Sequence, residues 1–321
     1  MMMQGGTVMA MTVWCVMTDW LLLAAACWLA ANLLFAGMIE GRRRRWERGV
    51  RRGADGVLSD AAPFSVGGGG VAVLLVHGFA DTPAVFRRLA DALSAHGLLC
   101  RAMRLPGAGA PLAVAARQTT DTWLAALRAE VAALREDHRE VWLLGHSMGG
   151  SLALLAQLDA PGTADGLILL APLIEVSAAR APFLPPRCWF RVTRAILPLA
   201  RVMESAFPLN VLTRGGARIG YTRDRYIPLA TYRGLFALVD RLRGRGSELH
   251  APFFAVLVEG DRIVDAPAAR AWLAACPATR RRIETLDGCG HALPQETALL
   301  DGLADGLAGF IAGDRPDKHA S

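Results

Sequence analysis

Three side chains of the types that perform acyl transfer follow strand-like apolar runs in this sequence. The first is Ser147, in Gly145-His146-Ser147-Met148-Gly149, a G-x-S-x-G pattern between the apolar run VWLLG and the helical run SLALLAQL. Glycines beside the serine let a strand turn sharply into a helix without side-chain collision. The pattern therefore predicts a serine nucleophile on a strained turn, with an ordinary Gly/Ser turn as the plain alternative.

A serine nucleophile needs a general base and a group that orients the base. His291 follows the last strand-like run, in a loop that contains glycines, and Asp261 directly follows the run FFAVLVEG. Asp265, four residues later, is the alternative orienting group, although it is placed to cap a helix that begins at Ala266. We expect a catalytic triad of Ser147, Asp261 and His291, in the chain order Ser, Asp, His.

The negative charge that forms on the substrate oxygen must be stabilised by backbone N–H groups. We expect one from Met148, the residue after the nucleophile, and the other from Phe79, which follows His77-Gly78 at the end of the run VAVLLV. A plain turn at the end of a strand is the alternative for this second segment. The chemistry requires no cofactor, and the six cysteines lack the spacing of a zinc site or a disulfide framework.

The segments around these residues alternate between strand and helix patterns. Helix starts are indicated at Thr82-Pro83 and at Thr120-Asp121. The aliphatic runs between helices are apolar enough to be buried on both faces, as in a parallel sheet. The sequence therefore predicts an α/β fold with a doubly wound, mostly parallel sheet whose carboxyl edge collects the candidate site residues. The strand-like runs are VAVLLVHG, LLCRAMRL, VWLLGHS, GLILLAP, FFAVLVEG and RRIETLD.

The N-terminal part of the chain is apolar enough to cross a bilayer. Its first 39 residues contain a single charged side chain, Asp19, and residues 20–39 form an apolar run interrupted only by Asn32. A helix of that length spans about 30 Å, the hydrocarbon thickness of a bilayer. Seven arginines follow within residues 42–52 and predict that this end stays cytoplasmic. A cleaved signal peptide is the alternative, but no basic region precedes the run.

Composition divides the chain into an anchor with its basic flank, residues 1–52, a linker rich in glycine, alanine and serine, residues 53–70, a folded domain, residues 71–313, and a tail, residues 314–321. About residues 173–250 interrupt the alternation with proline- and arginine-rich helical pieces, which predicts an inserted helical cap over the carboxyl edge of the sheet. The cap holds 13 arginines against five acidic residues. Because no nucleic-acid reading motif accompanies the arginines, we expect a membrane and not a nucleic acid as partner.

Apolar residues of the predicted cap are candidates for an acyl pocket, although such a stripe is more often the packing of the cap itself. These candidates are Phe183, Leu184, Trp189, Phe190, Ile196, Leu197 and Leu199.

The motifs VHGF, GHSMGG, EGDRIVD and GCGHAL, in this order, resemble those of the α/β-hydrolase superfamily. Over about residues 71–312 the chain looks like the carboxylesterase and monoacylglycerol lipase branch, which is related to the serine aminopeptidase-like hydrolases. Relatives often carry Pro-Gly-His-Gly after the second motif strand, whereas this chain has Pro106-Gly107-Ala108-Gly109. The missing histidine is not part of the triad, so the resemblance still implies a serine hydrolase.

The function expected from these features is the cleavage of carboxylic esters through an acyl-serine intermediate, by an enzyme anchored in the membrane by one helix with its catalytic domain in the cytoplasm. An anchor and an arginine-rich apolar cap favour lipid-like substrates, such as monoacylglycerols, lysolipids or other medium- to long-chain acyl esters; small soluble esters are the alternative. An amidase, peptidase or acyltransferase would keep the same triad. A non-catalytic membrane scaffold is disfavoured because the candidate triad is complete.

Overall fold

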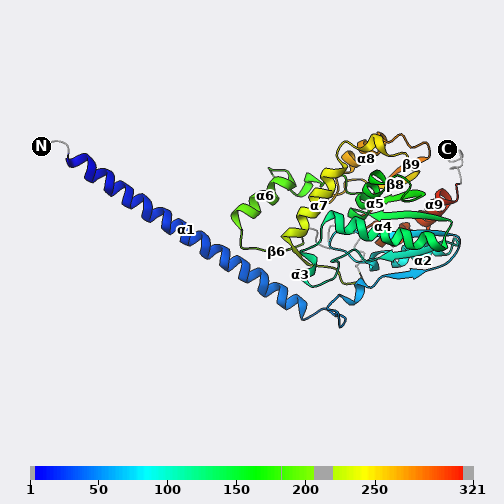
Figure 1. Cartoon of the computed structure of the whole chain (residues 1–321), viewed down its shortest axis with the longest axis horizontal. Coiled ribbons are helices and arrows are strands. Elements are labelled where there is room, and N and C mark those ends of the chain that lie inside the picture. The colour runs from blue at the N-terminus through cyan, green and yellow to red at the C-terminus, as the bar shows by residue number, and fades with distance from the viewer. Residues whose placement is uncertain (1–3, 182, 206–219, 314–321) are drawn as a thin grey trace.

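A long N-terminal helix leads into a layered α/β body in the computed structural model of the chain (Figure 1). The structure describes residues 4–181, 183–205 and 220–313. The predicted tail lies outside the described residues.

A seven-stranded sheet forms the centre of the body, in the order β1-β3-β2-β4-β5-β8-β9. β1 pairs antiparallel with β3, and the other neighbouring strands pair in parallel. The predicted doubly wound, mostly parallel sheet is therefore confirmed. Its strands are β1 (Phe64–Val66), β2 (Val71–Val76), β3 (Leu99–Met103), β4 (Glu140–His146), β5 (Gly166–Leu170), β8 (Phe253–Val258) and β9 (Arg281–Leu286).

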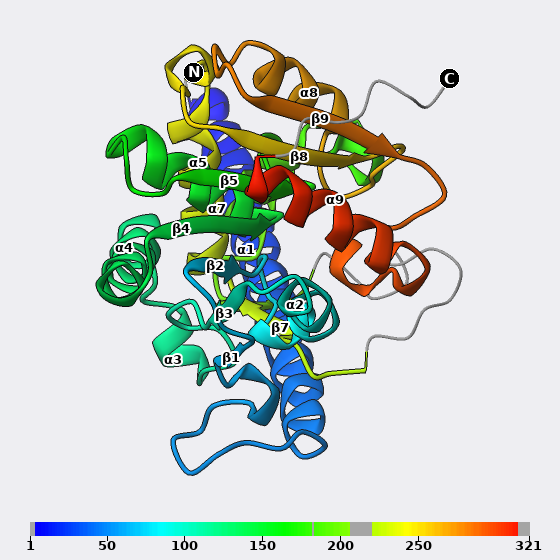
Figure 2. The ribbon, with the colours of Figure 1, turned by 90° about the vertical axis from the view of Figure 1, so that its right-hand side faces the viewer.

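Helices cover both faces of the sheet, with α2 and α9 on one face and α4, α5, α7 and α8 on the other (Figure 2). Side chains from alternate strand positions join one buried cluster on each face. Burial on both faces explains why the central strands are apolar throughout. The helices are α2 (Arg87–Ser94), α3 (Leu112–Ala115), α4 (Thr120–Asp137), α5 (Met148–Asp159), α7 (Leu229–Leu242), α8 (Ala266–Ala274) and α9 (Leu300–Ala312).

The sheet begins earlier in the chain than the composition suggested. Strand β1 lies within residues 53–70, which we predicted to be a linker, and pairs with β3 from Phe64 to Val66. Leu58 and Ala61, in the same stretch, are buried. The glycine-rich character belongs to the turn between β1 and β2, where Gly67 and Gly69 adopt positive φ angles and leave no space for a Cβ.

The chain between β5 and β8 is longer than one crossover requires. α7 packs against α4 and α5 and is the crossover helix of this unit. The part before it, described as residues 171–181, 183–205 and 220–228, contains α6 (Pro186–Ile196) and the paired strands β6 (Val202–Glu204) and β7 (Tyr226–Pro228). We call this part the inserted segment. The predicted cap range, residues 173–250, thus also included a helix of the body.

Helix α1 (Gln4–Glu47) is 44 residues long and projects well beyond the body (Figure 1). Its apolar side chains are mostly exposed; Leu22 and Leu34 keep 68% and 75% of their surface. Within the described residues, the stretch Met11–Glu47 has the length and hydropathy needed to cross a membrane. An exposed helix of this composition fits a bilayer segment or a signal sequence better than a core helix of a soluble protein.

Candidate active site

The turn at Ser147 is shaped by close backbone packing. A Cβ on Gly145 would lie 2.4 Å from the backbone of Gly149, and a Cβ on Gly149 would lie 1.9 Å from the Val76 carbonyl oxygen. Both positions therefore require glycine, because β4, α5 and β2 approach too closely for a side chain. This is the physical reason for the glycines of the G-x-S-x-G pattern.

Ser147 has the strained backbone conformation that the pattern predicts, with φ 54° and ψ −118°. Its N–H donates to the Leu170 carbonyl at 2.9 Å, and its carbonyl accepts from the N–H groups of Gly150 at 3.0 Å and Leu173 at 3.1 Å. Strain of this kind persists where surrounding bonds over-determine the conformation. The turn holds the serine at the carboxyl end of β4, at the N-terminus of α5.

His291 and Asp261 are paired. The His291 Nδ1 and Asp261 Oδ2 atoms are 2.7 Å apart, and both side chains are almost fully buried. Because a carboxylate only accepts, His291 Nδ1 carries the proton and its Nε2 presents a lone pair. That is the tautomer that a general base for a serine hydroxyl needs.

Asp261 is held as a carboxylate. Its Oδ1 accepts the N–H groups of Ile263 at 2.7 Å and Val264 at 3.1 Å. Burial by itself raises the pKa of this carboxyl, but the charge and hydrogen bond of His291, together with the two N–H groups, bring the pKa below its usual value. The side chain that faces His291 therefore stays ionised at neutral pH.

The alternative aspartate has a structural role instead. The Asp265 side chain accepts the N–H of Ala268 at 2.9 Å and caps the N-terminus of α8. Within the described residues, Asp261 is the one of the two candidates that is hydrogen-bonded to His291.

Ser147 and His291 line one small cavity, of about 20 Å³, together with Phe79 and Leu235. The ring of His291 lies 5.0 Å from that of His146, the residue before the serine. No hydrogen bond between Ser147 and His291 is present in the described part of the chain, and such bonds often tighten only when substrate binds. The structure thus brings together all three residues of the predicted triad at the carboxyl edge of the sheet.

His146 supports the loop that carries His291. Its Nε2 lies 2.9 Å from the His291 carbonyl oxygen and donates to it, while its buried Nδ1 has no hydrogen-bond partner. Burial, followed by the neighbouring charge of His291, lowers the pKa of His146 to about 4. A neutral, buried imidazole bonded to the His291 carbonyl fits a packing role beside Ser147 and not proton transfer.

The loop after β2 lies against the nucleophile. A Cβ on Gly78 would be 3.3 Å from the Cβ of Ser147, so the backbone before Phe79 lies close to the serine, and Phe79 lines the same cavity. Met148, the other expected oxyanion donor, is the first residue of α5 and is buried. Both predicted donors are therefore next to Ser147.

His77 fixes the conformation of this loop. Its Nε2 accepts the Leu105 N–H at 3.1 Å, so its Nδ1 carries the proton and donates to the Gly78 carbonyl at 2.9 Å. Burial lowers the pKa of His77 and keeps the ring neutral. The histidine ties the loop after β2 to the loop after β3.

The inserted segment supplies contacts that the sequence patterns did not predict. The Arg223 guanidinium donates from Nε to the Ala80 carbonyl at 3.1 Å and from Nη2 to the Phe79 carbonyl at 3.4 Å. The Tyr221 hydroxyl donates to Asp81 Oδ1 at 2.8 Å. Ala80 has a positive φ of 56°, so the loop that these residues hold is itself strained. Arg223 also lines the cavity that contains Ser147.

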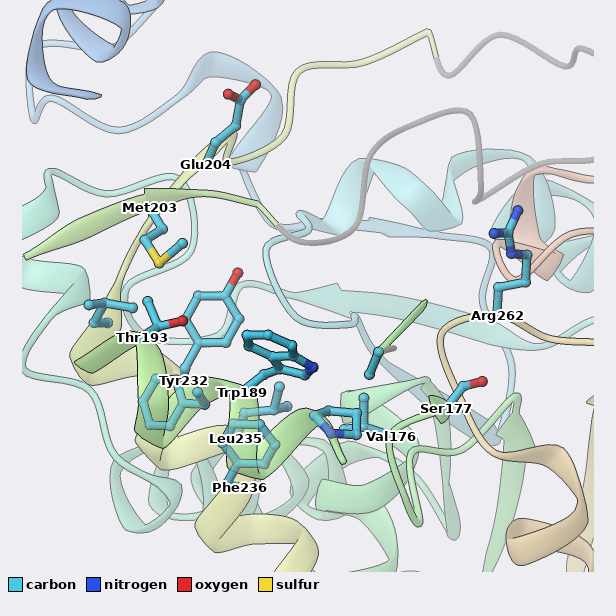
Figure 3. A pocket seen from close by; sticks show the side chains of 14 residues that line it. Val176, Ser177, Trp189, Thr193, Met203, Glu204, Tyr232, Leu235, Phe236 and Arg262 are labelled. Carbon is cyan, nitrogen blue, oxygen red and sulfur yellow. The ribbon is translucent and has the colours of Figure 1, made fainter. Parts of the chain in front are cut away.

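A second, larger cavity of about 350 Å³ lies between α6, β6 and α7 (Figure 3). Trp189, Tyr232 and Phe236 form an aromatic wall, and Glu204 and Arg262 stand on opposite sides of the opening (Figure 3). It does not contain Ser147, but Leu235 lines both cavities. The Tyr232 ring also packs on the ring of Phe79, 4.9 Å away.

The predicted acyl-pocket residues are only partly correct. Trp189 and Phe190 line this cavity, but Phe183 is 99% exposed and Ile196 is 54% exposed. The prediction was wrong for Ile196 because α6 turns only one face toward α7, and wrong for Phe183 because this residue precedes α6 and does not line the cavity. The pocket is completed by α7 and β6, whose contribution the apolar stripe did not reveal.

The comparisons with known proteins agree with this fold. Two solved structures superpose with TM-scores of 0.67 and 0.66: a soluble variant of monoglyceride lipase from Saccharomyces cerevisiae, 18% identical over 78% of this chain and 90% of that one, and the monoacylglycerol lipase of Paleococcus ferrophilus, 16% identical over 78% and 98%. At these identities the likeness establishes the fold, which is that of the α/β-hydrolases.

The family model described as serine aminopeptidase, S33, matches residues 70–298, and the chain belongs to that family. Among curated proteins, the chain is 34% identical over 125 residues to the thermostable monoacylglycerol lipase of Bacillus sp. (strain H-257), covering 39% of this chain and 50% of that one. It is 28% identical over 171 residues to the monoglyceride lipase of Rattus norvegicus, covering 51% and 55%. The chain thus spans about half the length of the curated relatives it matches, and the predicted superfamily and branch are confirmed.

Proposed function

We propose that this protein is a serine hydrolase that cleaves lipid-like carboxylic esters. The observation that carries the proposal is the buried His291–Asp261 pair beside the strained turn of Ser147, in one cavity at the carboxyl edge of the sheet. The relatives are monoacylglycerol and monoglyceride lipases, which favours an ester over an amide.

In this mechanism Ser147 Oγ attacks the ester carbonyl carbon while His291 Nε2 takes its proton. The N–H groups of Phe79 and Met148 stabilise the oxyanion, and the Asp261 carboxylate stabilises the imidazolium. His291 then gives the proton to the leaving alcohol. A water molecule, deprotonated in turn by His291, attacks the acyl carbonyl; the acid is released as His291 returns the proton to Ser147 Oγ.

The larger cavity is the proposed acyl site, which makes the inserted segment a cap over the substrate. Its volume of about 350 Å³ is within the range of small-ligand pockets, and its aromatic wall suits an alkyl chain. Leu235 lines both this cavity and the one that contains Ser147, so the acyl chain would lie along α7 with its carboxyl end at the nucleophile. This supports medium- to long-chain esters over acetates.

Helix α1 is proposed to anchor the enzyme in a membrane, with the body on the side of the arginine run, the cytoplasm by the positive-inside rule. Its exposed apolar surface supports the anchor. Resistance to extraction by alkaline carbonate tests it; release without detergent would contradict it.

Activity is tested with a fluorophosphonate probe and a substrate panel. We expect the wild type to be labelled and Ser147→Ala to remain unlabelled, with Ser151→Ala as the matched control, because Ser151 Oγ is bonded to the Leu173 carbonyl at 2.6 Å. Among p-nitrophenyl esters, kcat/KM should rise from acetate to octanoate or longer. Labelling of Ser147→Ala, or a preference for aminoacyl p-nitroanilides, would refute the esterase assignment.

A further inference from the structure

Helix α1 is attached to the inserted segment by polar groups within its apolar run. Trp28 Nε1 and Asn32 Nδ2 both donate to the carbonyl oxygen of Ile196, each at 3.0 Å. Ile196 is the last residue of α6, where helix carbonyls lack partners within the helix. Asn32 is only 2% exposed. We call Trp28, Asn32 and Ile196 the helix clamp.

The clamp explains the interruption of the apolar run at Asn32. An amide in a membrane-spanning helix is unfavourable unless it bonds to a partner, and such residues typically bond across to another helix. Asn32 Nδ2 does this while also bonding to the Trp28 carbonyl of its own helix at 3.0 Å. The residue is therefore a contact between two elements, not a defect in the span.

A second attachment holds the C-terminal end of α1. The Trp46 ring lies 5.8 Å from the ring of Tyr226 in β7. Arg52, just after the helix, donates to the Gly109 carbonyl at 2.7 Å and pairs with Glu47. Attachments at both Asn32 and Trp46 define the angle between α1 and the inserted segment, beside which α1 runs in Figure 1.

The position of the clamp along α1 determines how deep α6 lies in the bilayer. Asn32 lies seven residues before Ile39, where the apolar run ends at the arginine side. At 1.5 Å per residue this is about 10 Å along the helix. If residues 20–39 span the hydrocarbon, the carboxyl end of α6 lies within the leaflet next to the arginines and not in water.

The side chains of α6 suit that position. Ile196, the last residue of α6, and Leu199, just beyond the helix, are 54% and 40% exposed. The exposed residues Arg191 and Arg194 can extend their charged groups toward the headgroups. An amphipathic helix with arginines on one side and apolar residues on the other typically lies about 5–10 Å into the boundary between headgroups and acyl chains.

We propose that the helix clamp seats α6 in the leaflet beside the arginine run, so that the cavity between α6 and α7 opens to the lipid bilayer and takes its ester from there. The inference rests on the proposed anchoring and ester hydrolysis. A phospholipid leaflet is the occupant because the exposed apolar residues Ile196 and Leu199 lie at the end of α6 that is bonded to Trp28 and Asn32 within the apolar run of α1. Trp189 and Phe190 of the same helix form the cavity wall.

The depth is measured by fluorescence quenching in full-length protein, with its native cysteines replaced by serine, in phosphatidylcholine–phosphatidylglycerol vesicles. An environment-sensitive label is placed at Leu199→Cys, or at Leu22→Cys as the reference within α1. With the clamp intact, doxyl-labelled lipids should quench both labels. In the Trp28→Phe/Asn32→Leu double variant, quenching at residue 199 should fall while that at residue 22 stays.

Activity gives the second readout. The double variant should lose about fivefold in kcat/KM on a monoacylglycerol held in the vesicles, the scale of one interhelical polar contact. Its kcat/KM on soluble p-nitrophenyl butyrate should stay within twofold. The matched control is Trp14→Phe/Leu33→Ala, which changes two lipid-exposed residues of the same helix and should behave as wild type.

The outcomes separate the two proposals. If residue 22 is not quenched, or the wild type has no esterase activity, the proposed function fails. If residue 22 is quenched but residue 199 is not, the seating of α6 is overturned while anchoring stands. Equal losses on vesicle and soluble substrates also overturn it, because the clamp would then only support the fold.

Discussion

The turn that carries Ser147 and the inserted segment that lies over it are held in different ways. Ser147 is fixed by backbone hydrogen bonds to Leu170, Gly150 and Leu173, between elements that are neighbours in the sheet or in the chain. The loop of Phe79 and Ala80 is instead held by the side chain of Arg223, 143 residues from Ala80. The position of the proposed nucleophile is thus set by the sheet, whereas the loop that carries the proposed oxyanion donor Phe79 is also held by the inserted segment, which we propose covers the substrate.

The placement of the proposed catalytic residues and the entry of substrate therefore depend on different parts of the molecule. Sheet-edge residues are placed by the packing of β2, β4, β8 and β9, so changes in the inserted segment can alter the substrate without moving Ser147 or His291. Two side-chain contacts of the inserted segment link the entry of substrate to the proposed reaction. Arg223 bonds to the loop of Phe79 and Ala80, and the helix clamp joins α6 to α1.

The largest effect is expected at the sheet edge. Asp261→Asn should lower kcat about 10⁴-fold, because an amide cannot hold His291 in the required tautomer. Asp265→Asn is the matched control: it retains an N-cap acceptor for α8, and kcat should stay within about threefold. Ester hydrolysis under saturating substrate measures both. Comparable losses in the two variants would mean that the orienting aspartate is misassigned.

Backbone packing at the turn predicts the next effect. Gly149→Ala places a methyl group 1.9 Å from the Val76 carbonyl, which only a shift of β2 or α5 can relieve. The free energy of unfolding should fall by about 3 kcal/mol or more. Gly302→Ala, in α9 with no atom within 4 Å of the new methyl, should raise it by about 0.5–1 kcal/mol. Urea unfolding monitored by tryptophan fluorescence compares them, and a tolerated Gly149→Ala would contradict the close approach.

A third prediction concerns pH. The pKa of His146 is about 4 in the folded protein and 6.5 normally, so the unfolded chain binds the proton more tightly between these values. The neutral histidine favours folding above about pH 6.5, and that contribution, about 3 kcal/mol, is lost as pH falls toward 4. His146→Gln keeps an N–H for the His291 carbonyl but does not titrate. Its unfolding free energy should therefore decline less between pH 6.5 and 4.5; an unchanged slope would show that His146 is not buried and neutral.

The smallest effect tests the inserted segment. Arg223→Gln removes the charged donors to the Phe79 and Ala80 carbonyls and should lower kcat about tenfold, the scale of a charged hydrogen bond. Arg223→Lys should recover part of the loss. Arg225→Gln, which breaks a surface pair with Glu204 and a contact of the guanidinium with the Tyr226 ring, should change kcat less than twofold. An effect on KM alone would place Arg223 in substrate binding, without a role in holding the oxyanion loop.

Local patterns predicted the elements well because each depends on near neighbours. The six apolar runs became β2, β3, β4, β5, β8 and β9, and the helix indicated at Thr120 begins there, with Thr119 and Thr122 forming its capping box. Asp265 caps α8 as its position suggested. The missed strands β1, β6 and β7 are each three residues long and are recognised only by their pairing, β1 with β3 and β6 with β7.

Contacts between distant segments were not predictable in the same way. Arg223 is one of 13 arginines in the region predicted to be the cap, and nothing local distinguishes it from Arg225, which lies on the surface. The acyl-pocket prediction was only partly correct for a similar reason: Trp189 and Phe190 of α6 line the cavity but Ile196 does not, and the sequence does not show which side of α6 faces α7. Asn32 was noted as an interruption of the apolar run, but its partner, Ile196, lies 164 residues away.

The sequence by itself determined the alternation of strands and helices, the order of Ser147, Asp261 and His291, and the apolar length of α1, because these follow from periodicity, turn chemistry and composition. Only the tertiary structure decided that Asp261 and not Asp265 holds His291, that Arg223 supports the oxyanion loop, and that α1 is clamped to α6. Each of these pairings joins elements that are far apart in the chain. Whether it forms depends on the distance between the two side chains and on their burial, which no local sequence pattern specifies.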